Sequence, residues 1–214
     1  MRKYLIYMML FAGVSAFNAP LAIAGTHEDI LIAAANDQNN VVMDLIDKGM
    51  DINTSDPSGT TLLMFAARNN NEKMVEYLIG KRANILKQNN FGDSALGLAS
   101  FNGSLPIVKR LIAAGADPAG GGWNALHYAA FNGHTDVVKF LVEKRAALDV
   151  TAPNRQTALM FAARNGHKDV VTSLVEAGAN VNFKDGHGNS ALSLAKKTGN
   201  TVIADYLAKK GAVD

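Results

Sequence analysis

A segment of about 33 residues recurs along the chain, and this repeat restricts the fold more than any other feature of the sequence. Five copies are clear: TLLMFAARNN from Thr61, SALGLASFNG from Ser94, NALHYAAFNG from Asn124, TALMFAARNG from Thr157 and SALSLAKKTG from Ser190. A weaker copy, EDILIAAAND, begins at Glu28. The first strongly apolar residue recurs at intervals of 33, 33, 30, 33 and 33, at Ile30, Leu63, Leu96, Leu126, Leu159 and Leu192. A unit this short cannot bury its own apolar face, so neighbouring units must stack into an array.

Each copy predicts two short helices joined by a turn. Leu63 and Ala66, and their equivalents in the other copies, share one face of a first helix. A second apolar run with the same spacing, such as Val138 and Leu141, predicts a second helix. The copy at Glu28 lacks the Thr, Ser or Asn that opens the other five. In those five, the side-chain oxygen of the opening residue can cap the first helix: Thr61, Ser94, Asn124, Thr157 and Ser190.

Glycines mark where the helices should end. Gly49, Gly115 and Gly178, like Gly211, follow second helices, where a left-handed residue is favoured. Arginine replaces this glycine at positions 82 and 145, at a cost of about 1 kcal/mol if φ is positive there. The Asn-Gly pairs at 102–103, 132–133 and 165–166 resemble hairpin turns. Because each pair separates the two helices of one unit, we expect it to end the first helix instead.

These motifs resemble the ankyrin repeat. NALHYAA at Asn124 is similar to the T-P-L-H-x-A signature of that family, and GADPA at Gly115 and GANVNFKDGHGN at Gly178 resemble its loop. No copy has the signature proline, and only His127 keeps the signature histidine. The resemblance implies an all-α solenoid of about six helix-turn-helix units joined by short β-hairpin-like loops. The repeats are expected at about residues 26–59, 60–92, 93–122, 123–155, 156–188 and 189–214.

The family resemblance also implies a function class. Ankyrin arrays are binding scaffolds without catalysis that use their hairpin tips and the concave face of the first helices. It further implies a structural, hydrogen-bonding role for His134 and His167. The first and last units have the polar character of end caps, the last through Lys196, Lys197, Lys209 and Lys210.

Residues 1–24 have the plan of a secretory signal peptide. Arg2 and Lys3 come first, an uncharged apolar run covers residues 4–17, and Ala22 and Ala24 fit a cleavage site before residue 25. The alternative, a membrane anchor, is disfavoured because 14 apolar residues fall short of the ~20 that span a bilayer. We expect a bacterial protein whose mature domain, residues 25–214, is periplasmic and free of the membrane. Secretion into the medium is the alternative.

The charge balance argues against a nucleic-acid partner. The full chain has 21 basic and 19 acidic residues, but Arg2 and Lys3 lie in the predicted signal peptide. Without them the chain is formally neutral, so it lacks the clustered positive charge of a general nucleic-acid surface. The absence of cysteine excludes disulfides and a cysteine nucleophile.

The run GGG at residues 120–122 raises the question of a phosphate cradle. Neither G-x-x-x-x-G-K-[ST] nor G-x-G-x-x-G occurs in the sequence. The interval between Leu96 and Leu126 is 30 residues and not 33, so three residues are missing from this repeat. We therefore expect residues 119–122 to form a tight turn. No two of the five histidines have the i, i+4 spacing of a helical zinc site. We therefore expect no catalytic residue, no metal and no cofactor.

Candidate protein-binding residues follow the small residues of the first helices, which the resemblance places on the concave face. Aromatic and Arg residues are enriched among binding hot spots. The alternative to a binding role is that Phe101 and Phe131 pack on neighbouring helices. The candidates are Arg68, Asn69, Phe101, Asn102, Phe131, Asn132, Arg164 and Asn165. Weaker candidates on or near the loops are Phe91, Trp123, Asn154, Arg155 and His187.

Three functional hypotheses follow. The first is a non-catalytic adaptor or regulator of another periplasmic protein, acting as a monomer, although an exposed Phe pair could also support a dimer. The second is a secreted effector that binds a host protein. The third is an enzyme, which would require strongly perturbed side chains in one pocket.

Overall fold

The computed structural model describes residues 26–119 and 123–214. Within these residues the chain forms twelve α-helices and no strand. The predicted signal peptide and the glycine run at residues 120–122 lie outside the described residues. The helices are α2 (His27–Ala35), α3 (Asn39–Asp47), α4 (Leu62–Arg68), α5 (Glu72–Gly80), α6 (Ala95–Phe101), α7 (Leu105–Ala113), α8 (Ala125–Asn132), α9 (Thr135–Glu143), α10 (Ala158–Asn165), α11 (Lys168–Glu176), α12 (Ala191–Lys197) and α13 (Thr201–Lys209).

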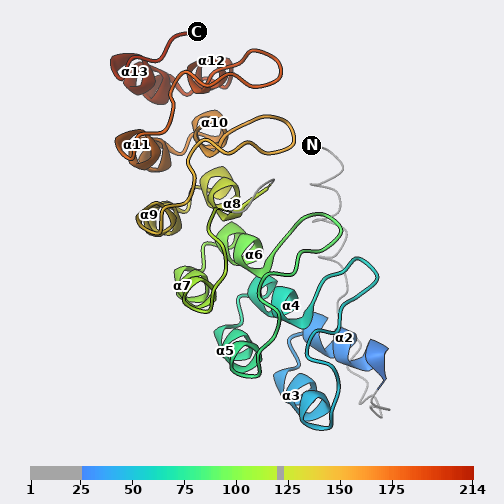
Figure 1. Ribbon diagram of the computed structural model, residues 1–214. Helices are drawn as coiled ribbons and strands as arrows, with labels where there is room; N and C mark the ends of the chain where they lie inside the picture. The colour runs from blue at the N-terminus through green and yellow to red at the C-terminus, as the bar shows by residue number, and fades with distance from the viewer. Residues whose placement is uncertain (1–25, 120–122) are drawn as a thin grey trace.

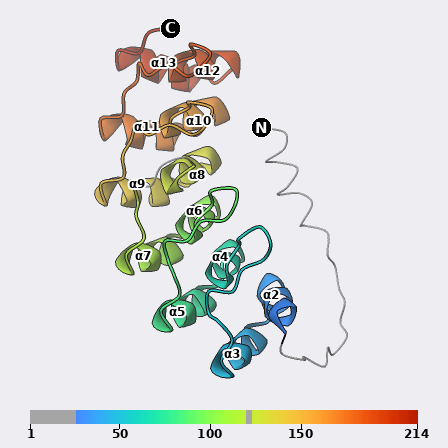
Figure 2. The same ribbon diagram turned by 45° about the vertical axis from the view of Figure 1, so that its right-hand side comes forward.

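The helices form two parallel rows, which confirms the predicted solenoid (Figures 1 and 2). The even-numbered helices make the inner row and the odd-numbered helices the outer row. The array bends so that the inner row and the long loops lie inside the curve (Figure 1). Consecutive inner helices pack more closely than consecutive outer helices. The reason is the small residue at their interfaces, since Ala66, Ala99, Ala129 and Ala162 are all buried.

The inner helices begin where the sequence predicts. The opening side chains of five repeats each accept a hydrogen bond from a backbone amide three residues later, as Thr61 does from Met64 at 3.3 Å. The prediction that the first repeat lacks such a cap is wrong. Thr26 caps α2, and the Asp29 carboxylate accepts from the Thr26 amide in return, at 2.9 Å. Helix α2 starts earlier within its repeat than the other inner helices, so its cap also lies earlier in the repeat.

The helix ends also agree with the predictions. Gly49, Gly115, Gly178 and Gly211 have φ between 85° and 102°. Arg82 and Arg145 take the same left-handed conformation, with φ of 65° and 62°. Two of the Asn-Gly pairs end inner helices through a left-handed glycine, Gly133 after α8 and Gly166 after α10. Helix α6 ends just before its Asn-Gly pair.

Hairpin-like turns join the repeats on the inner side of the array. In four of them a backbone amide donates to a carbonyl four residues later: Asp56 to Thr60, Asn89 to Asp93, Ala152 to Gln156 and Asp185 to Asn189. Four connections contain 14 residues each, 48–61, 81–94, 144–157 and 177–190, whereas residues 114–124, between α7 and α8, number 11. The shortened connection therefore lies in the middle of the array and contains Trp123.

A candidate protein-binding face on the inner helices

One line of equivalent positions runs along the inner helices and changes character from repeat to repeat. We call Arg68, Phe101, Phe131, Arg164 and Lys197 the inner-helix row; each lies at or next to the end of its helix. The residues three positions earlier form a second, apolar line on the same helical face. Its members are Phe65, Leu98, Tyr128, Phe161 and Leu194.

The two arginines of the row stack on the aromatic residue one turn earlier. The Arg68 guanidinium carbon lies 4.8 Å from the centre of the Phe65 ring, and that of Arg164 lies 5.4 Å from the Phe161 ring. Both phenylalanines are buried. Burial lowers the pKa of Arg68 and of Arg164 from the usual arginine value. An arginine titrates far above neutral pH, so both side chains remain cations at pH 7.

Five rings meet in the middle of this face. We call Phe101, Trp123, Tyr128, Phe131 and Phe161 the aromatic cluster. Trp123 is at its centre, with ring centroids 4.7 Å from Phe161, 5.2 Å from Tyr128 and 6.1 Å from Phe131. Phe101 meets Tyr128 edge to face at 5.9 Å. Phe161 is fully buried, whereas the other four rings are half-buried.

Phe101 and Phe131 are half-buried, so each agrees in part with both alternatives raised by the sequence, packing on a neighbouring helix and exposure to a partner. Each ring packs against a neighbouring aromatic residue, and each also keeps part of its surface accessible to solvent. The Tyr128 hydroxyl donates to the Asp93 carboxylate, which ties the cluster to the loop before α6. Ring contacts and this hydrogen bond thus connect the half-buried aromatic groups of the face to one another and to a neighbouring loop.

The four asparagines predicted beside the row have a different environment. Each side-chain amide donates to a main-chain carbonyl at the end of the preceding inner helix, at 2.6 to 3.1 Å: Asn69 to Ala34, Asn102 to Arg68, Asn132 to Phe101 and Asn165 to Phe131. These bonds link consecutive repeats. The structure therefore places these amides in the stack itself, and the aromatic and basic groups remain as the candidate binding residues of the face.

His134 and His167 also join neighbouring repeats. Their Nε2 atoms lie 2.9 Å from the carbonyl oxygens of Phe101 and Phe131, respectively. A carbonyl can only accept, so Nε2 carries the proton in each bond. His127 is buried, with Nε2 2.9 Å from the Val150 carbonyl oxygen, and burial lowers its pKa to about 4. The structural role implied for His134 and His167 is confirmed.

A comparison with protein families decides what the repeats are. The family model described as "Ankyrin repeats (3 copies)" matches residues 9–89, 30–120, 81–154, 96–185 and 144–214, which together cover most of the sequence. The chain is an ankyrin-repeat protein. Such repeats form protein-interaction scaffolds, so the chain presents a surface for binding other proteins.

Known proteins match this ankyrin-repeat chain over limited segments. The B-cell lymphoma 3 protein homolog of Mus musculus is 39% identical over 77 residues, 36% of this chain and 17% of that protein. Zygote-specific protein 3 of Chlamydomonas reinhardtii is 35% identical over 99 residues, 45% of this chain and 26% of that protein. The putative palmitoyltransferase ZDHHC13 of Danio rerio is 30% identical over 118 residues, 53% of this chain and 18% of that protein. The matched region thus spans about a quarter or less of each relative.

The loop candidates of the ankyrin-repeat protein are distributed over four of the connections between repeats. Phe91 is 45% exposed at the tip of the turn before α6. Asn154 and Arg155 are exposed in the turn before α10, and His187 is exposed in the turn before α12. Only Trp123 among the loop candidates joins the aromatic cluster.

Sequence reasoning missed Tyr128 and Phe161. A signal was present, because both fall at the position of Phe65 when the repeats are aligned. Among residues 26–119 and 123–214, no group of three or more His, Asp or Glu side chains could hold a metal ion. No helix in this described part is long and apolar enough to cross a membrane.

Proposed function

We propose that this ankyrin-repeat chain is a non-catalytic adaptor or regulator that binds another protein in the periplasm and acts as a monomer. Its binding site is the inner-helix face, by which we mean the inner-helix row together with the aromatic cluster. The observation that carries the proposal is the position of Phe101 and Phe131. Both rings remain half-exposed in the middle of the array, with Arg68 and Arg164 on either side. Aromatic and Arg side chains at the centre of a contact surface supply most of the binding energy in protein complexes.

The geometry of the aromatic cluster supports binding by a preformed surface. Ring contacts and the Tyr128–Asp93 hydrogen bond hold the aromatic groups in place before any partner arrives. A surface that is already ordered loses less conformational entropy on association. The inner-helix face is therefore better suited to recognition than the exposed loop residues Phe91, Asn154 and His187.

The proposed location rests on the sequence of residues 1–24, whose basic start, apolar run and small-x-small end are typical of an exported protein. The same pattern agrees with a second candidate, an effector released from the cell to bind a host protein. The proposal of a non-catalytic role rests on the family. The palmitoyltransferase named among the relatives matches over only 18% of its length, so it gives no support for catalysis here.

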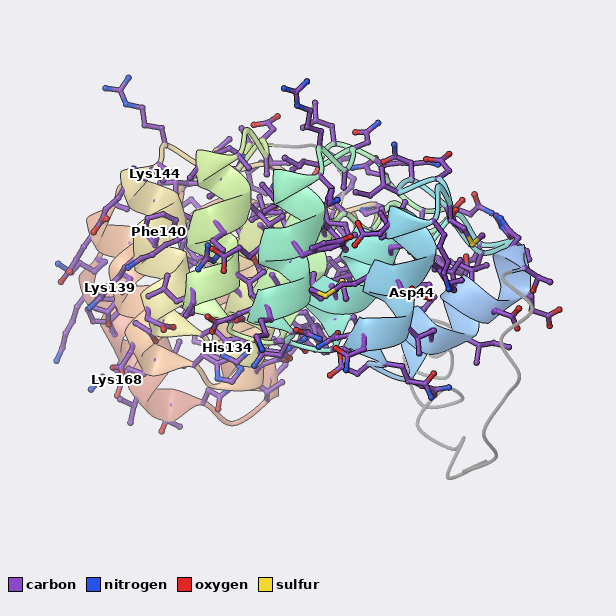
Figure 3. The ribbon with its side chains drawn as sticks, turned by 90° about the horizontal axis from the view of Figure 1, so that it is seen from below. Asp44, His134, Lys139, Phe140, Lys144 and Lys168 are labelled. Atoms are coloured by element: carbon purple, nitrogen blue, oxygen red, sulfur yellow. The ribbon has the colours of Figure 1, made fainter. Side chains whose placement is uncertain are left out.

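The test is a crosslinked pull-down with the full chain, carrying a C-terminal tag, expressed in its own host. Proteins captured from the periplasmic fraction are identified by mass spectrometry. The Phe101→Ala/Phe131→Ala variant removes the two half-exposed rings of the row. Its matched control is Phe140→Ala, since Phe140 is a half-buried aromatic residue on the outer helix α9 (Figure 3).

We expect one dominant periplasmic protein, captured by the wild type and the control and lost in the double variant. Capture that is equal for all three proteins would contradict the inner-helix face. Bait recovered mainly from the culture medium would contradict the periplasmic role and favour the secreted effector. The mass of the purified chain, measured by light scattering, tests the monomer.

A further inference from the structure

The order of side chains along the inner-helix row indicates which kind of partner the face would bind. From the second repeat to the fifth it contains Arg68, Phe101, Phe131 and Arg164, so two cations enclose two aromatic rings. The second and fifth repeats share an almost identical segment, and their arginines stack on equivalent phenylalanines. The second and fifth repeats, on either side of the two Phe residues, are therefore built alike.

Both guanidinium groups contact neighbouring side chains. Arg68 lies over the Phe65 ring, and Arg164 lies over the Phe161 ring while donating to the side chains of Gln156 at 3.3 Å and Asn165 at 3.4 Å. A guanidinium that lies over an aromatic ring can still donate hydrogen bonds from its planar edge. A carboxylate can accept two parallel hydrogen bonds from such an edge.

The carboxylates near the row are already engaged in the loops. Asp56, which attracts the Arg68 charge, accepts hydrogen bonds from the Ser58 hydroxyl at 2.7 Å and the Thr60 amide at 2.8 Å. Asp93 accepts the Tyr128 hydroxyl. These hydrogen bonds hold both carboxylates in their turns, where they keep their negative charge, and the row itself combines aromatic and basic groups.

We infer that the partner of this face is a protein segment with apolar side chains between two carboxylates. This inference rests on the proposed function and specifies its partner. Neighbouring packed helices are about 8–10 Å apart, so three repeat steps separate Arg68 from Arg164 by roughly 24–30 Å. An extended segment covers this distance when about seven to nine residue steps separate its two acidic groups. Its apolar side chains lie on Phe101 and Phe131, and its carboxylates meet the two arginines.

A single-stranded nucleic acid is the other polymer that combines negative charge with groups that stack on aromatic rings. The charge of the neighbouring repeat disfavours it. Residues 26–59 contain seven acidic residues and one lysine, and this strongly negative repeat is next to Arg68. A nucleic acid carries a charge at every phosphate and is repelled there. A segment with only two carboxylates places its charges at the two arginines.

The test is a selection of random peptides of about 12 residues, long enough to cover the row, displayed on phage and captured by the full chain. Enriched peptides are synthesised, and their affinities are measured for three variants. Arg68→Glu/Arg164→Glu reverses the charges of the two arginines, and Phe101→Ala/Phe131→Ala removes the two rings between them. Arg82→Glu/Arg145→Glu is the matched control, because it makes the same charge change at exposed ends of outer helices. Circular dichroism establishes that each variant is folded.

We expect the enriched peptides to have acidic residues on both sides of an apolar centre. Their affinity should fall about tenfold or more in Arg68→Glu/Arg164→Glu and in Phe101→Ala/Phe131→Ala, and stay unchanged in the control. Peptides that lose affinity only in the Phe variant would overturn this inference and leave the proposed function standing. Peptides insensitive to both variants, or no enrichment at all, would count against both. A labelled single-stranded oligonucleotide that binds more tightly than the peptides, and only with Arg68 and Arg164 intact, would overturn the protein partner.

Discussion

The indole ring of Trp123 stacks on the phenyl ring of Phe161, with centroids 4.7 Å apart and ring planes inclined by 32°. Trp123 precedes α8 and Phe161 belongs to α10, so this contact joins the fourth and fifth repeats. We expect Trp123→Ala to lower the free energy of unfolding by about 1–3 kcal/mol, because it removes a half-buried ring and uncovers Phe161. Urea unfolding followed by circular dichroism measures the change.

Trp123→Phe is the control for this contact, since it keeps an aromatic ring at the position and should recover more than half of the loss. Trp123 is the sole tryptophan of the chain, so its fluorescence also reports on the cluster. An unchanged unfolding midpoint in Trp123→Ala would show that the indole adds nothing to the stack.

Leu126 tests the interior of the array. Its side chain is 1% exposed on α8, and Leu126→Ala leaves a cavity between neighbouring inner helices. We expect a loss of about 2–5 kcal/mol, the usual range for a buried Leu. Phe131→Ala, on the same helix but half-exposed, should cost less. If Phe131→Ala destabilises as much as Leu126→Ala in urea unfolding, Phe131 is a core residue and not a residue of the binding face.

The helix positions were predictable because they depend on local chemistry repeated at a known interval. Caps such as Thr61, left-handed ends such as Gly49 and apolar spacing each act within a few residues. The cap at Thr26 was missed because the first repeat departs from that register. The aromatic cluster was not predictable in detail, since the contact of Trp123 with Phe161 depends on how two successive repeats stack.

The candidate residues divide by how they recur. Asn69, Asn102, Asn132 and Asn165 occur at equivalent positions in four repeats, as expected for residues that serve the stack, and all four bind the preceding helix. The neighbouring position instead changes between Arg and Phe. A position that varies between units is free of the stacking constraint and is therefore the better candidate for partner recognition. The sequence contained this distinction, although hydrogen-bond partners were needed to recognise it.

Gly133 tests how closely the repeats approach each other. Its φ is 81°, and a Cβ atom there would overlap the imidazole of His167, which is bonded to the Phe131 carbonyl. Gly178 has a φ of 96° and open space around the same position, so Gly178→Ala isolates the backbone strain, about 1–2 kcal/mol. We expect Gly133→Ala to cost clearly more in urea unfolding. Equal losses in the two variants would show that His167 can move away without penalty.

Acid should weaken the fold through His127. Burial lowers its pKa from 6.5 to about 4 in the folded chain. Between these two values the unfolded chain binds a proton that the folded chain does not, so stability falls as the pH decreases from about 6.5 to 4. The shift corresponds to a loss of stability on the order of 3 kcal/mol.

Below about pH 4, protonation of Asp185 adds a second loss of stability. Burial raises the pKa of Asp185, but hydrogen bonds from Gln156, Asn189 and His187 outweigh it and lower the pKa to about 2.

Urea unfolding at a series of pH values separates the two groups. His127→Gln should flatten the dependence between about pH 6.5 and 4, because the buried group no longer titrates. Asp185→Asn should leave that window intact and reduce the further loss below about pH 4. His187→Gln, in an exposed turn, is the control for a general effect of removing a histidine. A wild-type stability that stays constant from pH 6.5 to 4 would contradict a neutral, buried His127, since a histidine that is free to protonate in the folded chain produces no such loss.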